Sequence, residues 1–168
     1  MSSNYLISIL GRLFSTISTL TLIPSSSLHK KRFTCEAIHP TLTSNVEGLK
    51  TSFDIEVTSP PSLPKILGYP SNFRLINGSR LSLSCQSKGG YPLGRLSWYR
   101  LESNTDSLNL IDNSFVVRHQ EELTENNLTM IVSPTDNNVT LICQVSNSYL
   151  YSLGQRYQSN ITVEVACE

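Results

Sequence analysis

The clearest regularity of this chain is an alternation of apolar and polar residues, most marked between residues 78 and 146. In the run LSLSCQS, Leu81, Leu83 and Cys85 fall on one phase, and serine and glutamine fall on the other. This period of two predicts a β-strand with one buried side and one solvent-facing side. The run RLSWYR repeats the pattern with Leu96 and Trp98, so we expect the indole to point into the same core.

Two more alternating runs follow after residue 126, separated by a turn around Pro134. Their inward positions are Leu128, Met130 and Val132 in the first run, and Val139, Leu141, Cys143 and Val145 in the second. Weaker runs predict strands at residues 64–67, 72–75, 108–111, 115–119 and 156–165, the first two being halves of one strand. No window shows a convincing helical period, although residues 5–16 fit neither template. The pattern therefore predicts an all-β protein.

Composition supports a globular chain without a strong charge. Of its 168 residues, 39% are hydrophobic and 15% are charged, and thirteen basic residues balance thirteen acidic ones. Net charge therefore gives no reason to expect nucleic acid or an anionic membrane surface as a partner. No uninterrupted apolar stretch reaches the length of a membrane-spanning helix.

Two distant segments follow the same plan. STLTLIPSSSLHKKRFTCEA, from residue 18, and NLTMIVSPTDNNVTLICQV, from residue 127, each contain an alternating strand, a proline, a polar corner and a strand with a cysteine. Cys35 thus takes the place of Cys143, which indicates an internal repeat. Alternatively, residues 1–23 form a secretory leader, or the serine-rich, acid-free start is a mitochondrial transit peptide. Gly11 and Arg12 interrupt the apolar run of a leader.

The arrangement of Cys85, Trp98 and Cys143 resembles an immunoglobulin domain. The resemblance implies that Cys85 and Cys143 form a disulfide between strands B and F, and that Trp98 on strand C packs against it in the core of a β-sandwich. The alternative is two buried thiols in another β fold. Strands E to G of a preceding domain would then account for residues 18–58, with Cys35 on strand F.

Short motifs narrow the resemblance to the second constant-like set. Gly90-Tyr91-Pro92 precedes the tryptophan, and Cys35 begins a Cys-x-Ala-x-His-Pro ending. The chain in this respect resembles nectin-like, nephrin and kin-of-irregular-chiasm proteins, which are cell-adhesion receptors. The tyrosine found two residues before the strand F cysteine in many immunoglobulin domains is replaced by Phe33 and Leu141.

These observations predict the domain organisation. Residues 1–58 form a partial immunoglobulin-like domain containing strands E to G only, with an uncertain start. Residues 59–64 form a proline-rich junction, and residues 65–166 form one complete immunoglobulin-like β-sandwich. Cys167 follows the last strand and has no partner in that domain, which favours a longer parent protein.

Four Asn-x-Ser/Thr sequences are candidate N-glycosylation sites, namely Asn77, Asn127, Asn138 and Asn160. The last three lie on the outward phase of their strands, and Asn77 lies in an Asn-Gly turn. We therefore expect all four to be exposed to solvent.

Other chemistry finds no support in the sequence. His29, His39 and His119 are too scattered for a metal site, and Cys35 with His39 would lack two further donors. The sequence contains no nucleophile elbow and no phosphate-binding loop. Glu121 and Glu122 are typical of a solvated loop and not of a pair of carboxylates in a cleft. We expect no catalysis, no metal and no cofactor.

Protein binding is the remaining class of function, and the outward face of the sheet containing strands C, F and G is the expected binding surface. Tyr99, Arg100 and Gln144 are the candidate partner-binding residues. The resemblance implies a fragment of an extracellular adhesion or recognition receptor that binds other cell-surface proteins, homophilically or heterophilically, at the plasma membrane. The alternative is a secreted soluble ligand or decoy.

Overall fold

The computed structural model describes residues 2–10, 13–38, 49–70, 74–102 and 107–166, with side chains from residue 16 onward. The chain divides into two compact units, Met1–Val57 and Thr58–Glu168.

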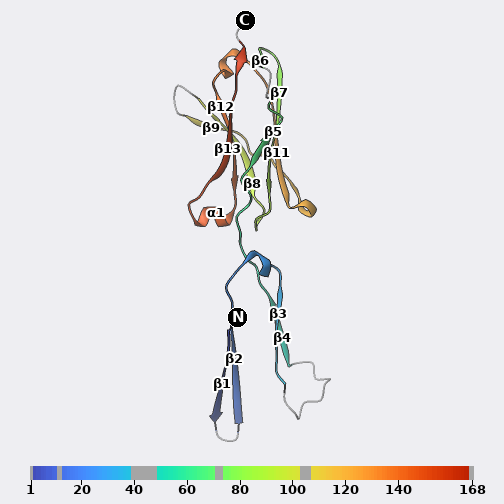
Figure 1. Ribbon diagram of the computed structural model, residues 1–168, viewed down its shortest axis with the longest axis vertical. Helices are drawn as coiled ribbons and strands as arrows, with labels where there is room; N and C mark the ends of the chain where they lie inside the picture. The colour runs from blue at the N-terminus through green and yellow to red at the C-terminus, as the bar shows by residue number, and fades with distance from the viewer. Residues whose placement is uncertain (1, 11–12, 39–48, 71–73, 103–106, 167–168) are drawn as a thin grey trace. The chain divides into compact units, whose positions relative to one another are not determined.

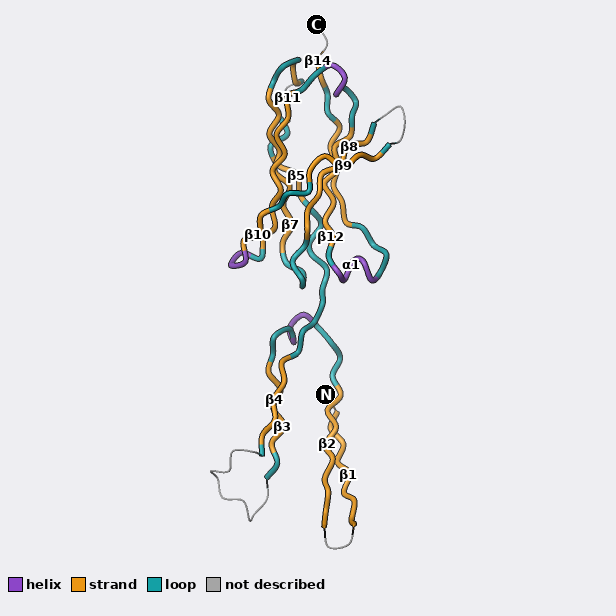
Figure 2. The backbone as a smooth tube through the Cα atoms, turned by 180° about the vertical axis from the view of Figure 1, so that it is seen from behind, coloured by secondary structure: helices purple, strands orange, loops and turns teal. Residues whose placement is uncertain are grey.

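The second unit is a sandwich of two four-stranded antiparallel sheets (Figures 1 and 2). One sheet has the order β10–β11–β7–β5, formed by Val116–Arg118, Leu123–Ile131, Arg80–Lys88 and Lys65–Leu67. The other has the order β13–β12–β8–β9, formed by Tyr157–Thr162, Thr140–Ser146, Arg95–Leu101 and Leu108–Asp112. The all-β prediction is confirmed.

The core lies between these sheets and contains the alternating residues that the sequence places inward. Leu81, Leu83 and Cys85 of β7 are buried, and so are Leu96 and Trp98 of β8. From β12 and its flanks, the core contains Val139, Leu141, Cys143 and Val145. Alternation therefore places one row of each strand in the space between two sheets.

Short elements close the sandwich. Of the two predicted halves of the first strand, the one at 64–67 forms β5, which pairs with β7 in one sheet. β6 (Leu75–Ile76) pairs in parallel with β14 (Val165–Ala166), and residues 72–73 of the predicted second half lie outside the described residues. Single 3₁₀ turns occur at η2 (His119–Glu121) and η3 (Pro134–Asp136).

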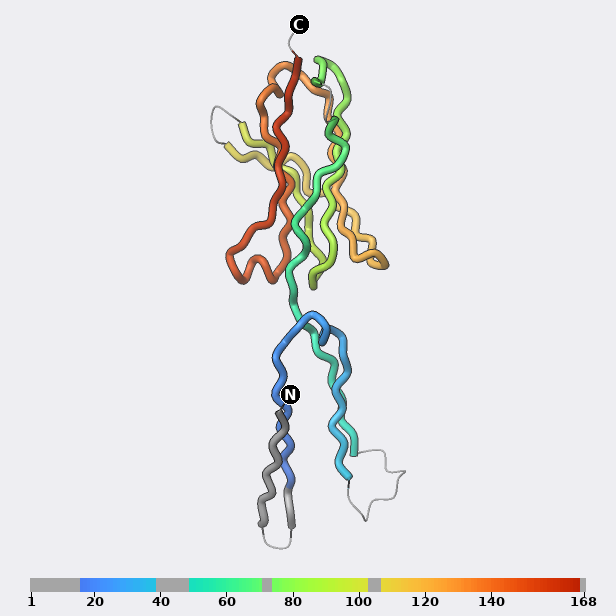
Figure 3. The backbone as a smooth tube through the Cα atoms, viewed as in Figure 1, coloured from blue at the N-terminus to red at the C-terminus, as the bar shows by residue number. Residues whose placement is uncertain are grey.

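A five-residue helix, α1 (Ser148–Ser152), interrupts the connection from β12 to β13 (Figures 1 and 3). The sequence pattern did not predict this helix, because five residues are too few to show a helical period. Its local signal is Asn147, whose Oδ1 accepts a hydrogen bond from the Leu150 backbone N–H at 3.0 Å. The same side chain donates to the carbonyl oxygens of Ser59 and Pro92, each at 2.9 Å. Asn147 thereby holds three loops together at one end of the sandwich.

In the first unit, the described residues form two antiparallel strand pairs (Figures 1 and 2). β1 (Ser2–Leu10) pairs with β2 (Leu13–Thr21), and after the 3₁₀ turn η1 (Ser26–Leu28), β3 (Arg32–Glu36) pairs with β4 (Lys50–Asp54). Cys35 is a free, exposed cysteine on β3. The interpretation of residues 1–58 as part of an earlier domain stays a prediction, and Cys167 and His39 lie outside the described residues.

Candidate functional site: the outer face of the β13–β12–β8–β9 sheet

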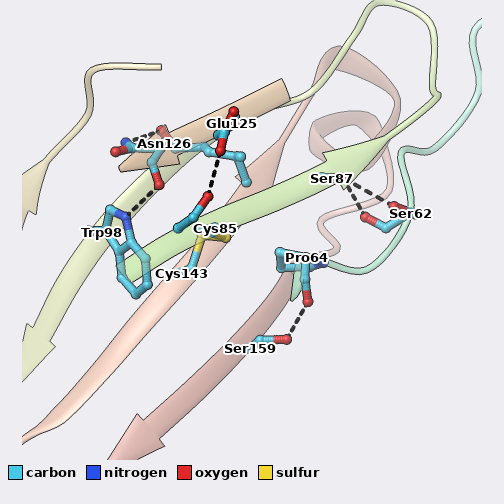
Figure 4. The surroundings of a disulfide bond; sticks show 11 residues. Ser62, Pro64, Cys85, Ser87, Trp98, Glu125, Asn126, Cys143 and Ser159 are labelled. Carbon is cyan, nitrogen blue, oxygen red and sulfur yellow. Dashed lines mark hydrogen bonds between the residues drawn. A yellow bond between two sulfur atoms is a disulfide. The ribbon is translucent and has the colours of Figure 1, made fainter. Parts of the chain in front are cut away.

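A disulfide fixes which side chains of the sandwich point inward. Cys85 of β7 and Cys143 of β12 are joined, with their Cα atoms 6.4 Å apart, and both are fully buried. The predicted disulfide is confirmed. Trp98 is also fully buried beside it, and its Nε1–H donates to the Asn126 carbonyl oxygen at 3.2 Å (Figure 4). Since these residues point inward, their neighbours along each strand point outward.

The outward neighbours on three strands form an apolar surface. Tyr99 of β8 lies directly opposite Ile142 of β12 on one side and Leu110 of β9 on the other. Leu101 of β8 lies opposite Leu108 of β9. Residues directly opposite in an antiparallel pair share a face, so these five side chains lie together. We call Tyr99, Leu101, Leu108, Leu110 and Ile142 the apolar face.

Exposure shows that the apolar face is not part of the core. Leu108 and Leu110 are 47% and 54% exposed. Ile142 is buried, yet it does not belong to the cluster of residues that forms the core. Its neighbours on the outer face therefore cover it.

A cavity of about 350 Å³ adjoins the apolar face near α1. Its lining includes Tyr99 and Leu108 from the apolar face and the buried Leu150 of α1. Polar groups come from Gln144 of β12 and from Gln155 and Arg156, which follow α1. The cavity thus combines apolar walls with amides and one guanidinium, and it could hold a large side chain of a protein partner.

The outer face of the opposite sheet has a different character. Ser84 Oγ and Gln86 Nε2 donate to Glu125 Oε1 at 2.7 and 3.2 Å, and Arg118 is paired with the same carboxylate. The Ser84 and Gln86 hydrogen bonds, aided by Arg118 and opposed by partial burial, lower the pKa of Glu125 below its ordinary value. The centre of this face is a hydrogen-bonded polar surface. Its exposed apolar residues, Leu67, Val116 and Ile131, each lie opposite a polar residue, namely Ser84, Glu125 and Arg80.

Arg100 occupies a different environment from Tyr99. It lies opposite Leu141, on the inward phase of β8, and its guanidinium binds the carboxylate of Asp136 in η3. It is also paired with Glu102. Burial alone would raise the pKa of Asp136, but hydrogen bonds from Arg100 and Ser133 outweigh it and hold the pKa below its ordinary value. Arg100 therefore anchors the corner before β12 and does not belong to the apolar face.

The other predicted site residues are placed as follows. Tyr99 and Gln144 both line the cavity. Asn77, Asn127, Asn138 and Asn160 are all exposed, and their glycosylation stays a prediction. The sequence reasoning missed Leu108, Leu110 and Ile142 as surface residues. The alternation pattern alone could have identified Ile142, because it is an apolar residue on the outward phase between Leu141 and Cys143.

Two further properties concern the described residues. Within them, no group of three His, Cys, Asp or Glu side chains is placed to hold a metal ion. No helix in the same ranges has the length and hydrophobicity needed to cross a bilayer.

Known proteins are similar to this chain in sequence or in fold. The chain is 28% identical to human nephrin over 139 residues, which covers 82% of this chain and 10% of nephrin. It is 29% identical to human vascular cell adhesion protein 1 over 133 residues, covering 77% of this chain and 16% of that protein. The chain thus spans a small part of the curated relatives it matches. A crystal structure of Rst D1-D2 shares the fold, with a TM-score of 0.52 and 18% identity over 69% of this chain and 54% of that one.

The predicted resemblance to immunoglobulin-superfamily adhesion receptors, nephrin among them, is confirmed by these relatives. The sequence profile of the CD80-like C2-set immunoglobulin domain matches residues 68–151, from the loop after β5 through β12 into α1. This span contains both cysteines of the disulfide, Trp98 and the whole apolar face. The chain belongs to the CD80-like C2-set immunoglobulin domain family.

Proposed function

We propose that this chain is part of an extracellular adhesion or recognition receptor and that it binds another cell-surface protein through the apolar face. The similarity to nephrin and to vascular cell adhesion protein 1 supports the class of function. The contrast between the two outer faces of the sandwich supports the location. It is the observation on which the proposal depends.

The contrast lies in the side chains that each outer face presents. A sheet whose outer face only meets water is stabilised by polar groups that hydrogen-bond, as Ser84, Gln86 and Glu125 do. Leu108 and Leu110 are exposed and lie opposite other apolar residues, Leu101 and Tyr99, so they leave contiguous apolar area that a protein partner could cover. Contiguous apolar patches on soluble proteins commonly mark interaction sites.

Each part of the surface has a role in this proposal. Tyr99 lies between Ile142 and Leu110 and is the central anchor, because a tyrosine offers a large contact area with few rotatable bonds. The cavity next to it receives one side chain of the partner. Gln144 and Arg156 lie in its lining and supply hydrogen bonds around the contact.

A matched pair of substitutions tests this proposal. Leu110→Asp places a charge on the apolar face, and Ser82→Asp places the same charge on the exposed polar face of the other sheet. We expect beads coated with the full chain to bind a panel of cultured cells, Leu110→Asp to reduce that binding at least about tenfold, and Ser82→Asp to leave it unchanged. Equal unfolding curves, followed by the fluorescence of Trp98, would show that both variants are folded. Equal cell binding by the wild type and Leu110→Asp would refute the proposal.

A further inference from the structure

We infer that an N-linked glycan on Asn160 covers the β13 side of the outer face and confines protein contact to β8, β9 and the segment around α1. The inference rests on the proposed function, since it concerns access to the same surface. It starts from the register of three neighbouring strands.

Asn160 lies in the same cross-strand row as the centre of the apolar face. Asn160 of β13 is directly opposite Ile142 of β12, and Ile142 is directly opposite Tyr99 of β8. Two strand spacings separate the Cα atoms of Asn160 and Tyr99, which corresponds to about 10 Å. Asn160 is exposed and its side chain points to the same side of the sheet as Tyr99.

The outer side of β13 is suited to a glycan rather than to an apolar contact. Its outward residues, Gln158, Asn160 and Thr162, are all polar and exposed, in contrast to the leucines of β9. Thr162 also completes the Asn-Ile-Thr acceptor sequence. An N-linked oligosaccharide is bulky and hydrophilic, so from this position it would stand over Ile142 and reach toward Tyr99.

The modification has a defined chemistry. The side-chain nitrogen Nδ2 of Asn160 loses one hydrogen and bonds to the anomeric carbon of an oligosaccharide supplied by a lipid-linked diphosphate donor. The bond from that carbon to the diphosphate oxygen breaks, and the lipid diphosphate leaves with the bonding electrons and takes up the proton.

The other three acceptor sites lie elsewhere on the sandwich. Asn127 is on β11, opposite Ser84, and therefore on the polar face of the other sheet. Asn77 lies in the turn between β6 and β7, and Asn138 lies between η3 and β12. Asn160 is the acceptor that shares a face with Tyr99, and Asn127 is its matched control.

The test uses the full chain secreted by cultured mammalian cells behind a cleavable secretion signal. Peptide mass spectrometry after enzymatic deglycosylation measures occupancy of Asn160. A monoclonal antibody raised against unglycosylated full chain, and selected because Tyr99→Ala and Leu110→Asp abolish its binding, is the protein-sized probe of the face. Its affinity is measured for the wild type, Asn160→Gln and Asn127→Gln.

We expect Asn160 to be occupied and the antibody to bind the wild type at least about tenfold more weakly than Asn160→Gln, or about 1.4 kcal/mol. Asn127→Gln should behave like the wild type. An unoccupied Asn160, or equal affinity for the wild type and Asn160→Gln, would overturn the inference. Because the antibody replaces the natural partner, this result is independent of the cell-binding test, in which failure of the proposed function appears as equal binding by Leu110→Asp.

Discussion

Two pairs of strands in this molecule have the same ladder and nearly opposite environments. β12 pairs with β13 in the second unit, β3 pairs with β4 in the first, and both pairs are antiparallel with alternating sides. Cys143 on β12 is fully buried, whereas Cys35 on β3 is exposed. The difference teaches that alternation assigns residues to sides of a sheet, while burial requires a second sheet over the apolar side.

The β3–β4 pair shows this division clearly. Phe33 and Phe53 lie opposite each other on one side, with their ring centroids 5.9 Å apart. The other side carries two ion pairs, Arg32 with Asp54 at 2.9 Å and Lys50 with Glu36 at 3.0 Å. The pair thus has an apolar side and a polar side, yet Phe53 is 58% exposed. Every residue of β4 is exposed, in contrast to β12.

Replacing the cysteines of each environment should give the largest difference in the free energy of unfolding. Replacing Cys85 and Cys143 together by alanine removes a buried link between the two sheets, which closes a loop with a sequence separation of 58. We expect the free energy of unfolding of the second unit to fall by about 2–5 kcal/mol. Urea unfolding followed by the fluorescence of Trp98, the single tryptophan of the chain, measures it.

The matched control is Cys35→Ser on the exposed side of β3. It should leave the urea midpoint of the Trp98 signal unchanged, because Cys35 is exposed and belongs to the first unit. A double variant as stable as the wild type would show that packing around Trp98, rather than the disulfide, holds the sheets together.

The next largest difference in the free energy of unfolding should come from substituting the carboxylate that binds an arginine in each unit. Asp136 binds Arg100 with its side chain 8% exposed, while Asp54 binds Arg32 with its side chain 50% exposed. Asp136→Asn should cost about 2–3 kcal/mol, since it weakens hydrogen bonds between charged groups and leaves the half-buried Arg100 without its full partner. Asp54→Asn should give no measurable change in the unfolding of either unit, because solvent screens an exposed pair.

Acid provides a second readout of the same corner. Because the pKa of Asp136 is lower in the folded protein than in the unfolded chain, its contribution is fully present above the unfolded-state pKa. It is lost as the pH falls through the lowered folded-state pKa. The wild type should therefore lose stability on acidification more steeply than Asp136→Asn below about pH 4. Parallel pH profiles of the two proteins would show that another carboxylate, such as Glu125, controls the acid transition.

The sequence was sufficient for features that depend on strand phase and insufficient for those that depend on contacts across the fold. The inward positions of Cys85, Trp98 and Cys143 follow from alternation, and their arrangement implied the sandwich. The pairing of Arg100 with Asp136 did not follow, since 36 residues separate them and Arg100 looks like a surface residue next to Tyr99. The apolar face was missed for a related reason: the opposition of Leu110 to Tyr99 depends on a register that changes between Trp98 and Tyr99.

The smallest effect should come from the phenylalanines of the first unit. Phe53→Ser removes the ring stacked on Phe33 and, because the pair is exposed, should weaken the β3–β4 ladder by only about 0.5–1 kcal/mol. Amide hydrogen exchange measures this as faster exchange in β3 and β4, with exchange in β12 unchanged as the internal control. Exchange in β3 and β4 that is slow in the wild type and orders of magnitude faster in Phe53→Ser would contradict this account. That result would mean that another part of the protein covers the apolar side of the β3–β4 pair, as the second sheet covers β12.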